Sequence, residues 1–371
     1  MIWQIKMACL ALAGLSATIQ AQAGTINLTI DSSLADYVLE VSCSGETVDE
    51  QRLRNSEVLQ AQIKHHTGLS PRHTMDAYIE GLQAASRCEV LEEDLFRFRF
   101  AVEEKESMSR AIDFLKARED EMVGFVIEKT APYFPADKQF SGAIVLSAAG
   151  QSCGGFSMDG AFFIDLPCVA EAVEEEYMAI KVLSAHETYH ALQYAFFAPF
   201  NEDMQRVDSP ESALNYLFLN LLLEGTAEFV ADSRVITGDS RLAGLLGGFA
   251  KKGYRRVNFN LRMVGYAAEV LAEKGDSQRR MRDMYSVGFS GNTGQQFYYV
   301  GAVMAEKIET AFGREALVCI IALSPEQFVL AYDAASLKGD AEATPIGAGA
   351  VNASRLLAEG KVSWESCADT P

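Results

Sequence analysis

The sequence predicts a predominantly helical α+β protein, with a small sheet ahead of one long helix and a helical C-terminal lobe. Three observations support this fold class. Helical spacing of apolar residues dominates the chain of 371 residues. The pattern changes to short β-type runs only near the start and between residues 142 and 167. A long helical pattern that contains two histidines then follows at residues 169–197.

The first 23 residues have the features of a secretory signal peptide. Lys6 gives a positive start, residues 7–17 form an apolar stretch too short to span a bilayer, and residues 21–23 (AQA) offer a small-residue cleavage site. We expect cleavage after Ala23 and a periplasmic or secreted protein. No later apolar run reaches membrane-spanning length, so we expect no membrane insertion of the mature chain.

The charge of the chain argues against some classes of partner. The formal net charge is −19 and the isoelectric point is near 4.7, which disfavours nucleic acid and anionic membrane surfaces. The single basic cluster, residues 251–262, is short and is interpreted as a solvated helix edge.

The cysteines indicate an oxidising compartment. Of the seven, Cys9 lies in the signal peptide, which leaves an even number in the mature chain. We expect neighbours to pair, one bond in each region: Cys43–Cys88, Cys153–Cys168 and Cys319–Cys367. No CxxC or Cys–His cluster indicates a thiolate metal site.

The elements can be read in order along the chain. After the signal peptide, residues 24–137 are expected to be mainly helical behind a short strand at 25–30, and residues 131–142, which contain two prolines and a glycine, are expected to be a linker. A domain over 138–336 and a loosely structured tail over 337–371 follow. The helical patterns of the first region lie at residues 49–64, 74–86 and 91–131.

The second region begins with two expected strands, residues 142–150 and 161–167, joined by a glycine-bearing turn. The long helix of residues 169–197 follows them. Ser209 is a good N-cap and Pro210 suits the first position of the next helix. Later helices are expected near residues 255–274, 278–285, 297–312 and 325–336.

The segment SAHETYHALQYAFF in the long helix carries an HExxH motif. Residues four apart lie on one helix face, so His186 and His190 can bind one metal ion. Glu187 points to the side, where it can reach a water on that metal and act as a general base. The alternative is a buried helix whose two histidines have ordinary packing roles.

A catalytic zinc ion needs a third protein ligand. The segment FLNLLLEGTAEFVAD is apolar nearly all round, so Glu224 and Glu228 are carboxylates in an apolar setting, which is costly without a partner. One of them could bind the metal while the other orients a histidine, and Gly225 would allow close approach beside Glu224. The remaining histidines lie far upstream and are expected in surface or capping roles: His65, His66 and His73.

HExxH followed by a helix with LLEGTAEF resembles the gluzincin metallopeptidases. The resemblance implies a zincin-like catalytic domain, with His186, His190 and Glu224 as ligands of one catalytic Zn²⁺ and Glu228 in the supporting acidic position. It also implies that residues 161–167 form the edge strand that pairs with an extended substrate. The gap between the second histidine and the ligand glutamate is longer than in thermolysin-like enzymes, and no GxMEN segment is present, so the subfamily stays open.

The resemblance implies peptide-bond hydrolysis of a peptide or protein substrate, with Glu187 as the base. Gluzincins use a tyrosine beside the developing oxyanion, for which Tyr298 is preferred to Tyr299 because it shares an apparently inward helix face with small residues. Two alternatives remain: a zinc-retaining, non-proteolytic envelope protein on a peptidase scaffold, and a helical protein without metal. Residues 24–137 could be a prodomain, a scaffold or part of the cleft.

Overall fold

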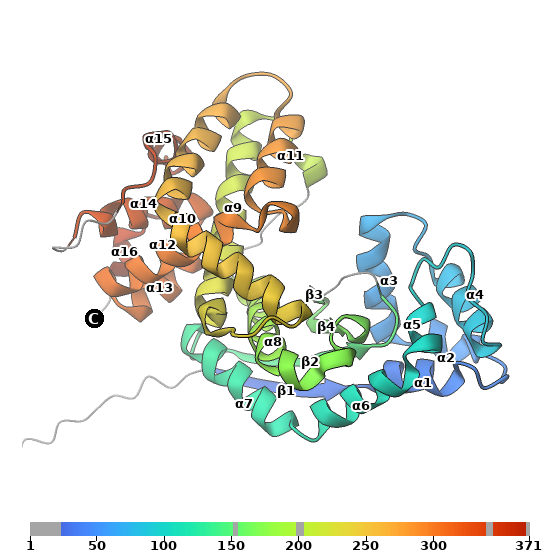
Figure 1. Cartoon of the computed structure of the whole chain (residues 1–371). Coiled ribbons are helices and arrows are strands. Elements are labelled where there is room, and N and C mark those ends of the chain that lie inside the picture. The colour runs from blue at the N-terminus through green and yellow to red at the C-terminus, as the bar shows by residue number, and fades with distance from the viewer. Residues whose placement is uncertain (1–23, 151–154, 198–203, 339–343, 369–371) are drawn as a thin grey trace, which may run out of the picture.

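The computed structural model describes residues 24–150, 155–197, 204–338 and 344–368. The expected signal peptide, residues 1–23, and Cys153 lie outside these ranges. In the described residues the protein is predominantly helical with one small sheet, as the sequence predicts. Figure 1 shows the N-terminal helices and the C-terminal helical lobe on opposite sides of this sheet.

Four strands and sixteen α-helices make up the described chain. The strands are β1 (Thr25–Asp31), β2 (Gln139–Ser147), β3 (Gly155–Met158) and β4 (Ala161–Asp165). The helices up to the histidine motif are α1 (Ser33–Val41), α2 (Glu50–Arg54), α3 (Glu57–Leu69), α4 (Met75–Ser86), α5 (Arg99–Glu103), α6 (Lys105–Lys116), α7 (Glu119–Thr130) and α8 (Val173–Phe196). The later helices are α9 (Pro210–Ala231), α10 (Arg241–Ala272), α11 (Ser277–Gly288), α12 (Gln296–Phe312), α13 (Arg314–Ile321), α14 (Pro325–Ser336), α15 (Ala348–Leu357) and α16 (Glu365–Ala368).

The sheet has the order β1-β2-β4-β3. β1, β2 and β4 are parallel, whereas β3 pairs antiparallel with β4. The expectation that residues 161–167 form the edge strand is therefore wrong, because β4 lies inside the sheet and β3 is the edge. Asp159 and Gly160 both have positive φ and make the two-residue turn of the β3–β4 hairpin, which is the Asp-Gly pattern that such hairpins favour.

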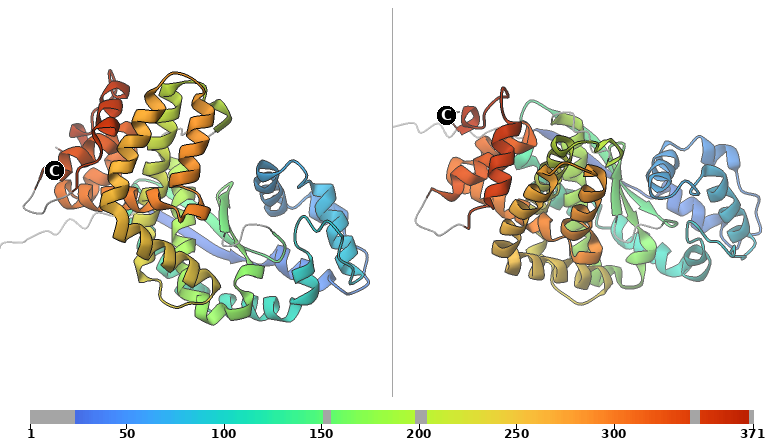
Figure 2. Two further views of the ribbon diagram at one scale, coloured as in Figure 1. Left: turned by 45° about the horizontal axis from the view of Figure 1, so that its top comes forward. Right: turned by 90° about the horizontal axis from the view of Figure 1, so that it is seen from above.

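The two faces of the sheet differ in what covers them. Val145, Phe156 and Phe163 form a buried cluster with Ala61 of α3 on one face. Side chains alternate along a strand, so Ser157 points to the opposite face, where it contacts α8. The two views in Figure 2 show the N-terminal helices reaching the β3–β4 hairpin. The sheet thus connects the N-terminal region to the histidine helix.

Two helices of the second region lie close to the positions predicted from the sequence. α8 begins after two turns of 3-10 helix and contains the whole motif. α9 begins at Pro210, and the Ser209 side chain accepts a hydrogen bond from the Ser212 backbone N–H in a capping box. This cap fixes the first residue of α9 and therefore contributes to the position along α8 at which Glu224 meets the two histidines.

Other elements differ from the expectations. α10 begins at Arg241 rather than near 255. One of its glycines, Gly253, packs against α12, where an added Cβ would meet the Tyr299 ring. The described part of the C-terminal tail, residues 344–368, is helical rather than loosely structured, and α15 packs on α10 where Gly347 touches Gly265. The last residues of the expected linker already belong to β2. Helices α1 and α13 have no counterpart among the expected elements.

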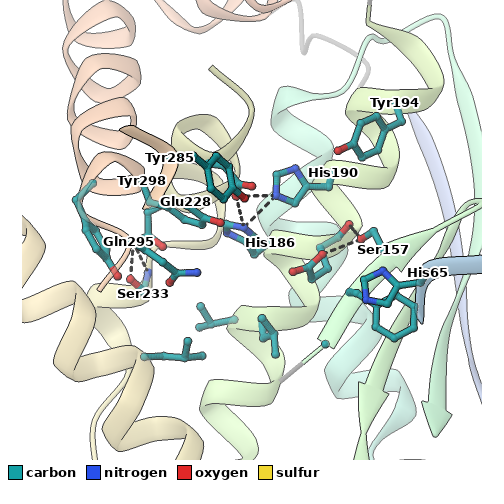
Figure 3. A pocket seen from close by; sticks show the side chains of 18 residues that line it. His65, Ser157, His186, His190, Tyr194, Glu228, Ser233, Tyr285, Gln295 and Tyr298 are labelled. Atoms are coloured by element: carbon teal, nitrogen blue, oxygen red, sulfur yellow. Dashed lines mark hydrogen bonds and ion pairs between the residues drawn. The ribbon is translucent and has the colours of Figure 1, made fainter. Parts of the chain in front are cut away.

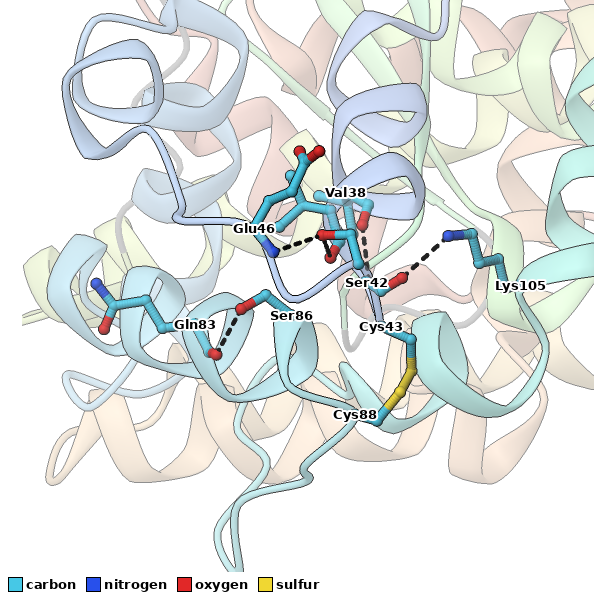
Figure 4. Close-up of a disulfide and its surroundings, with 10 residues drawn as sticks. Val38, Ser42, Cys43, Glu46, Gln83, Ser86, Cys88 and Lys105 are labelled. Atoms are coloured by element: carbon cyan, nitrogen blue, oxygen red, sulfur yellow. Dashed lines mark hydrogen bonds between the residues drawn. A yellow bond between two sulfur atoms is a disulfide. The ribbon is translucent and has the colours of Figure 1, made fainter.

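Two of the three expected disulfides are confirmed. Cys43–Cys88 joins the ends of α1 and α4, as Figure 4 shows, and Cys319–Cys367 ties α16 to α13. The bond between Cys153 and Cys168 stays a prediction, because Cys153 lies outside the described residues. Among the described residues, no helix is both long enough and apolar enough to cross a membrane.

The three upstream histidines are not surface residues. His66 and His73 are buried, and His65 is half-buried with its ring stacked on that of Phe156, the two centroids 3.7 Å apart. Burial lowers the pKa of His65 to about 4 and that of His66 to about 3, so both are neutral at physiological pH. The expectation of surface roles is wrong because α3 packs against the sheet.

Candidate functional site

Helix α8 holds the two histidines of the motif on one face. His186 and His190 are one turn apart, and their Nε2 atoms lie 3.1 Å from each other. Both side chains are almost fully buried. Neither proline nor glycine interrupts the helix between them, so the spacing of four residues produces a well-defined pair of nitrogen donors.

The third donor comes from α9. Glu224 Oε2 lies 3.1 Å from His190 Nε2 and 3.4 Å from His186 Nε2. Donors at two corners of a tetrahedral zinc site with bonds of about 2.1 Å are roughly 3.4 Å apart. The three atoms therefore have the spacing of three corners of such a site. Across the described ranges, this is the one group of three or more such donors that could hold a metal ion.

Close helix packing places Glu224 beside α12. A Cβ on Gly225 would lie 2.3 Å from Gly301 Cα, and a Cβ on Gly301 would lie 2.2 Å from the Leu221 carbonyl oxygen. Only glycine permits this approach of two backbones. The crossing brings Tyr298, one turn before Gly301, next to the candidate ligands.

The charges of the donor cluster are strongly coupled. Burial lowers the pKa of His190, but the Glu224 carboxylate raises it by more, to about 9. Burial raises the pKa of Glu224, but the two histidines hold it well below its usual range. Without a metal, the site is therefore an imidazolium–carboxylate pair, and a metal ion would take the place of the proton.

Gln193 orients the second histidine. Its Oε1 lies 2.7 Å from His190 Nδ1, and its amide group donates to Thr226 Oγ1 and the Leu223 carbonyl of α9. With Nδ1–H donating to Gln193, Nε2 is the nitrogen of His190 that faces Glu224. Nε2 donates its proton to Glu224 in the metal-free site and would be the atom that binds a metal once that proton is lost. The same glutamine also ties α8 to α9.

Glu228 is one turn beyond Glu224 and is buried. It accepts hydrogen bonds from the Ser233 hydroxyl and from Tyr254 Oη, the latter at 3.2 Å. Burial raises its pKa, while Ser233 and the nearby His186 oppose that shift. Glu228 therefore lies outside the donor triad and next to the first histidine.

Glu187 is held by the edge strand. Ser157 Oγ on β3 lies 2.9 Å from Glu187 Oε2 and 2.7 Å from the Glu187 carbonyl oxygen. Figure 3 shows Ser157 on the side of His186 that faces away from Tyr298. The carboxylate is thus fixed at the boundary between the sheet and the donor cluster.

The two candidate tyrosines point in different directions. The Tyr298 ring lies parallel to the His186 imidazole, with 6.0 Å between centroids, and it is half-buried in the pocket wall. Burial and the Glu224 charge raise the pKa of Tyr298 well above its usual value, so its hydroxyl keeps its proton. Tyr299 is buried beside Gly253 and Tyr254 of α10.

These side chains line one open pocket of about 450 Å³. The C-terminal lobe contributes Tyr285 and Gln295, and the N-terminal helices contribute His65. Gln295 has a left-handed backbone (φ 52°) at the start of α12, a conformation uncommon for a residue with a side chain. The pocket is therefore built from all three parts of the chain.

A family model described as "Putative zinc dependent peptidase (DUF5700)" matches residues 51–341. The chain belongs to this family. The matched segment contains the donor triad, Glu187, Tyr298 and the β3–β4 hairpin, whereas β1 and α1 precede it. No curated protein and no solved structure matches the chain.

Several residues in or beside the candidate site of this family member were not predicted from the sequence. Gln193 could have been found, because it follows the second histidine at i+3 on the motif helix. Ser157 and His65 could not, since they reach the pocket only through the antiparallel pairing of β3 and the packing of α3 on it. Tyr194 lies one turn after His190 and gave no signal beyond its helical spacing.

Proposed function

We propose that the protein hydrolyses peptide bonds with one zinc ion held by His186, His190 and Glu224. The observation that carries this proposal is the geometry of the three donors, whose separations of 3.1 to 3.4 Å match a tetrahedral zinc site in an open pocket. The Glu187 carboxylate, which is not one of the three donors, lines the same pocket. Membership of a zinc-dependent peptidase family supports it.

When bound, the zinc ion would supply Lewis acidity to the attacking water and the scissile carbonyl. Glu187 would accept the proton of that water and deliver it to the leaving amine. The Ser157 hydroxyl would keep the Glu187 carboxylate in the orientation that reaches both. Buried Glu228 would support the first histidine.

Tyr298 would donate a hydrogen bond to the oxyanion that develops on the scissile carbonyl. One observation favours it over Tyr299: the Tyr298 ring lies parallel to that of His186, whereas Tyr299 is buried against Gly253 and Tyr254 of α10. The raised pKa of Tyr298 keeps its hydroxyl protonated and able to donate.

The arrangement further supports a gluzincin-type, zincin-like catalytic domain over residues 138–336. An antiparallel edge strand next to the HExxH helix could pair with an extended substrate, and in this chain that strand is β3. Two disulfides are compatible with an extracytoplasmic protein, in keeping with the signal peptide expected at residues 1–23 and a periplasmic or secreted location.

The decisive experiment compares the wild type with Glu187→Gln for zinc content and for cleavage of a peptide library. We expect one zinc per chain in both, and a loss of hydrolysis of about 10²- to 10⁴-fold in the variant. Glu174→Gln is the matched control, an exposed glutamate in the first turn of the same helix, and it should behave as the wild type.

Other outcomes would count against the proposal in specific ways. Zinc without cleavage in the wild type would favour the non-proteolytic alternative. Undiminished cleavage by Glu187→Gln would refute the mechanism. If Glu228→Ala lost zinc while Glu224→Ala retained it, the assignment of the third ligand would be reversed.

A further inference from the structure

A second hollow opens beside the candidate active site, between the β3–β4 hairpin and the second half of α8. Its volume is about 400 Å³. It shares two wall residues, Ser157 and Tyr194, with the first pocket. Figure 3 shows both on the side of the histidines that faces away from Tyr298. The two hollows are therefore neighbours that share a wall where Ser157 of β3 meets Glu187.

Small residues make room for this hollow. Ala191 and Ala195 lie one turn apart on α8 and face the Gly160 turn across it. A larger side chain at either alanine would project into the space. Phe140 and Met158 complete an apolar wall.

Among the residues that line the hollow, one carries a side chain that is charged at neutral pH, and this charge is paired with a residue outside the hollow. Asp159 lies at the turn, where its carboxylate forms an ion pair with Lys64 of α3 at 2.7 Å. The remaining wall offers aromatic and aliphatic carbon, with the Ser157 and Tyr194 hydroxyls at the junction with the first pocket. Such a space favours an uncharged, apolar group.

Resting on the proposed function, we propose that this hollow is a substrate subsite that selects a large apolar side chain near the scissile bond. A peptide lying along the free edge of β3 would pass Ser157, and alternate side chains of an extended strand point to the α8 side. A side chain leaving the backbone there enters the hollow directly. The subsite makes peptides with phenylalanine, leucine or methionine at that position the preferred substrates.

The first test is the cleavage profile of the wild type on a peptide library, followed by matched peptides that differ only in Phe or Ala at the selected position. Burial of one large apolar side chain predicts a kcat/KM roughly 10- to 100-fold higher for the Phe peptide. The ratio of the two kcat/KM values is measured on one preparation, so an inactive fraction cancels.

Filling the hollow should remove the preference. In Ala195→Trp, at the exposed rim, and in Ala191→Leu, at the buried wall, we expect the Phe/Ala ratio to fall at least about fivefold while zinc content stays at one per chain. Ala117→Trp, an exposed position beyond α6, is the matched control and should keep the wild-type ratio.

The possible results distinguish a failure of the subsite proposal from a failure of the proposed hydrolytic function. Library cleavage without any apolar preference next to the scissile bond overturns the subsite and leaves the peptidase proposal standing. An apolar preference that survives in both filled variants also overturns it. Absence of all cleavage by zinc-loaded wild type overturns the function and the subsite together.

Discussion

Ser157 shows how one side chain outside the motif can govern its chemistry. A hydroxyl has a single proton, and Ser157 Oγ faces two acceptors of the same residue, the carboxylate and the carbonyl of Glu187. The proton can be donated to only one of them at a time. Donation to the carboxylate restricts the rotamer of Glu187, whereas donation to the carbonyl ties β3 to the backbone of α8. The motif supplies Glu187, the proposed base, and the edge strand orients its carboxylate.

We predict that Ser157→Ala lowers kcat by about 10- to 100-fold, the loss of one hydrogen bond to a charged group, while KM and zinc content change little. Ser157→Thr keeps the hydroxyl and should restore most of the rate. Steady-state kinetics on one peptide measures this, with Ser286→Ala, an exposed helical serine, as the control. An equal loss in the alanine and threonine variants would contradict a positioning role.

The His190–Glu224 pair predicts a pH effect in the metal-free protein. The pKa of His190 is raised to about 9 in the fold, against about 6.5 when unfolded. The stabilisation is therefore fully present below about pH 6.5 and is lost as the pH rises to about 9. Thermal unfolding in the presence of a chelator should give a midpoint that falls over this interval. Glu224→Gln should show a weaker dependence, and an identical slope would refute the assignment.

At the scale of elements, the crossing of α9 and α12 determines the width of the site. Glu224 precedes Gly225 on one helix and Tyr298 lies one turn before Gly301 on the other, so the contact of the two glycines sets the separation of ligand and tyrosine. Backbone atoms on both sides cannot rotate away from an added methyl group. The crossing is therefore intolerant of any larger residue.

We predict that Gly301→Ala destabilises the protein by about 1–3 kcal/mol or more and lowers activity, because the helices must separate. Gly124→Ala is the control, because Gly124 is exposed on α7 and an added Cβ meets nothing within 4 Å. Alanine reduces the backbone freedom of the unfolded chain, so this variant should be more stable than the wild type by up to about 1 kcal/mol. Urea unfolding of both variants measures the difference. Equal stabilities would mean that the two helices can move apart freely.

A second feature at the scale of elements is the packing of α3 against the sheet and its β3–β4 hairpin. Lys64 pairs with Asp159 at the turn, His65 stacks on Phe156, and Gln62 donates to Ser147 Oγ at 2.8 Å at the end of β2. These contacts hold the strand that carries Ser157. Through these contacts, the N-terminal helices help to position Ser157 in the candidate site, although they contain no recognisable catalytic motif.

At the scale of the whole molecule, residues 24–137 are built into the fold of the site. β1 pairs with β2 along its full length, and α7 contacts α8, where Glu121 forms an ion pair with Lys181 at 2.9 Å. Removal would expose a sheet edge and one flank of the histidine helix. This favours the scaffold and cleft interpretations over a removable prodomain.

We therefore predict that a chain starting at residue 138 is insoluble or inactive, whereas one starting at residue 24 is folded and binds zinc. Circular dichroism, zinc content and peptide cleavage of the two proteins make the comparison. Activity of the shorter chain equal to that of the longer one would establish residues 24–137 as a prodomain instead.

Much of this molecule follows from local pattern, and the failures have a common cause. The motif helix, the capped start of α9 and two disulfides were predictable, because each depends on residues close in sequence or on simple neighbour pairing. α10 was predicted too short, and only the contact of Gly253 with Tyr299 of α12 shows why a glycine is required in its first half. β3 was not predicted, because a strand of four residues is too short to show a clear alternating pattern and is defined by its pairing with β4.

By itself, the sequence determined the candidate donors: two histidines one turn apart, a glutamate between them as the proposed base, and two carboxylates on a later apolar helix, because helical periodicity is a local property. Only the tertiary structure decided which carboxylate meets the histidines, which strand forms the edge and which serine holds Glu187. Those choices depend on strand order and on the contact of two glycines, and both arise from long-range packing that no local pattern encodes.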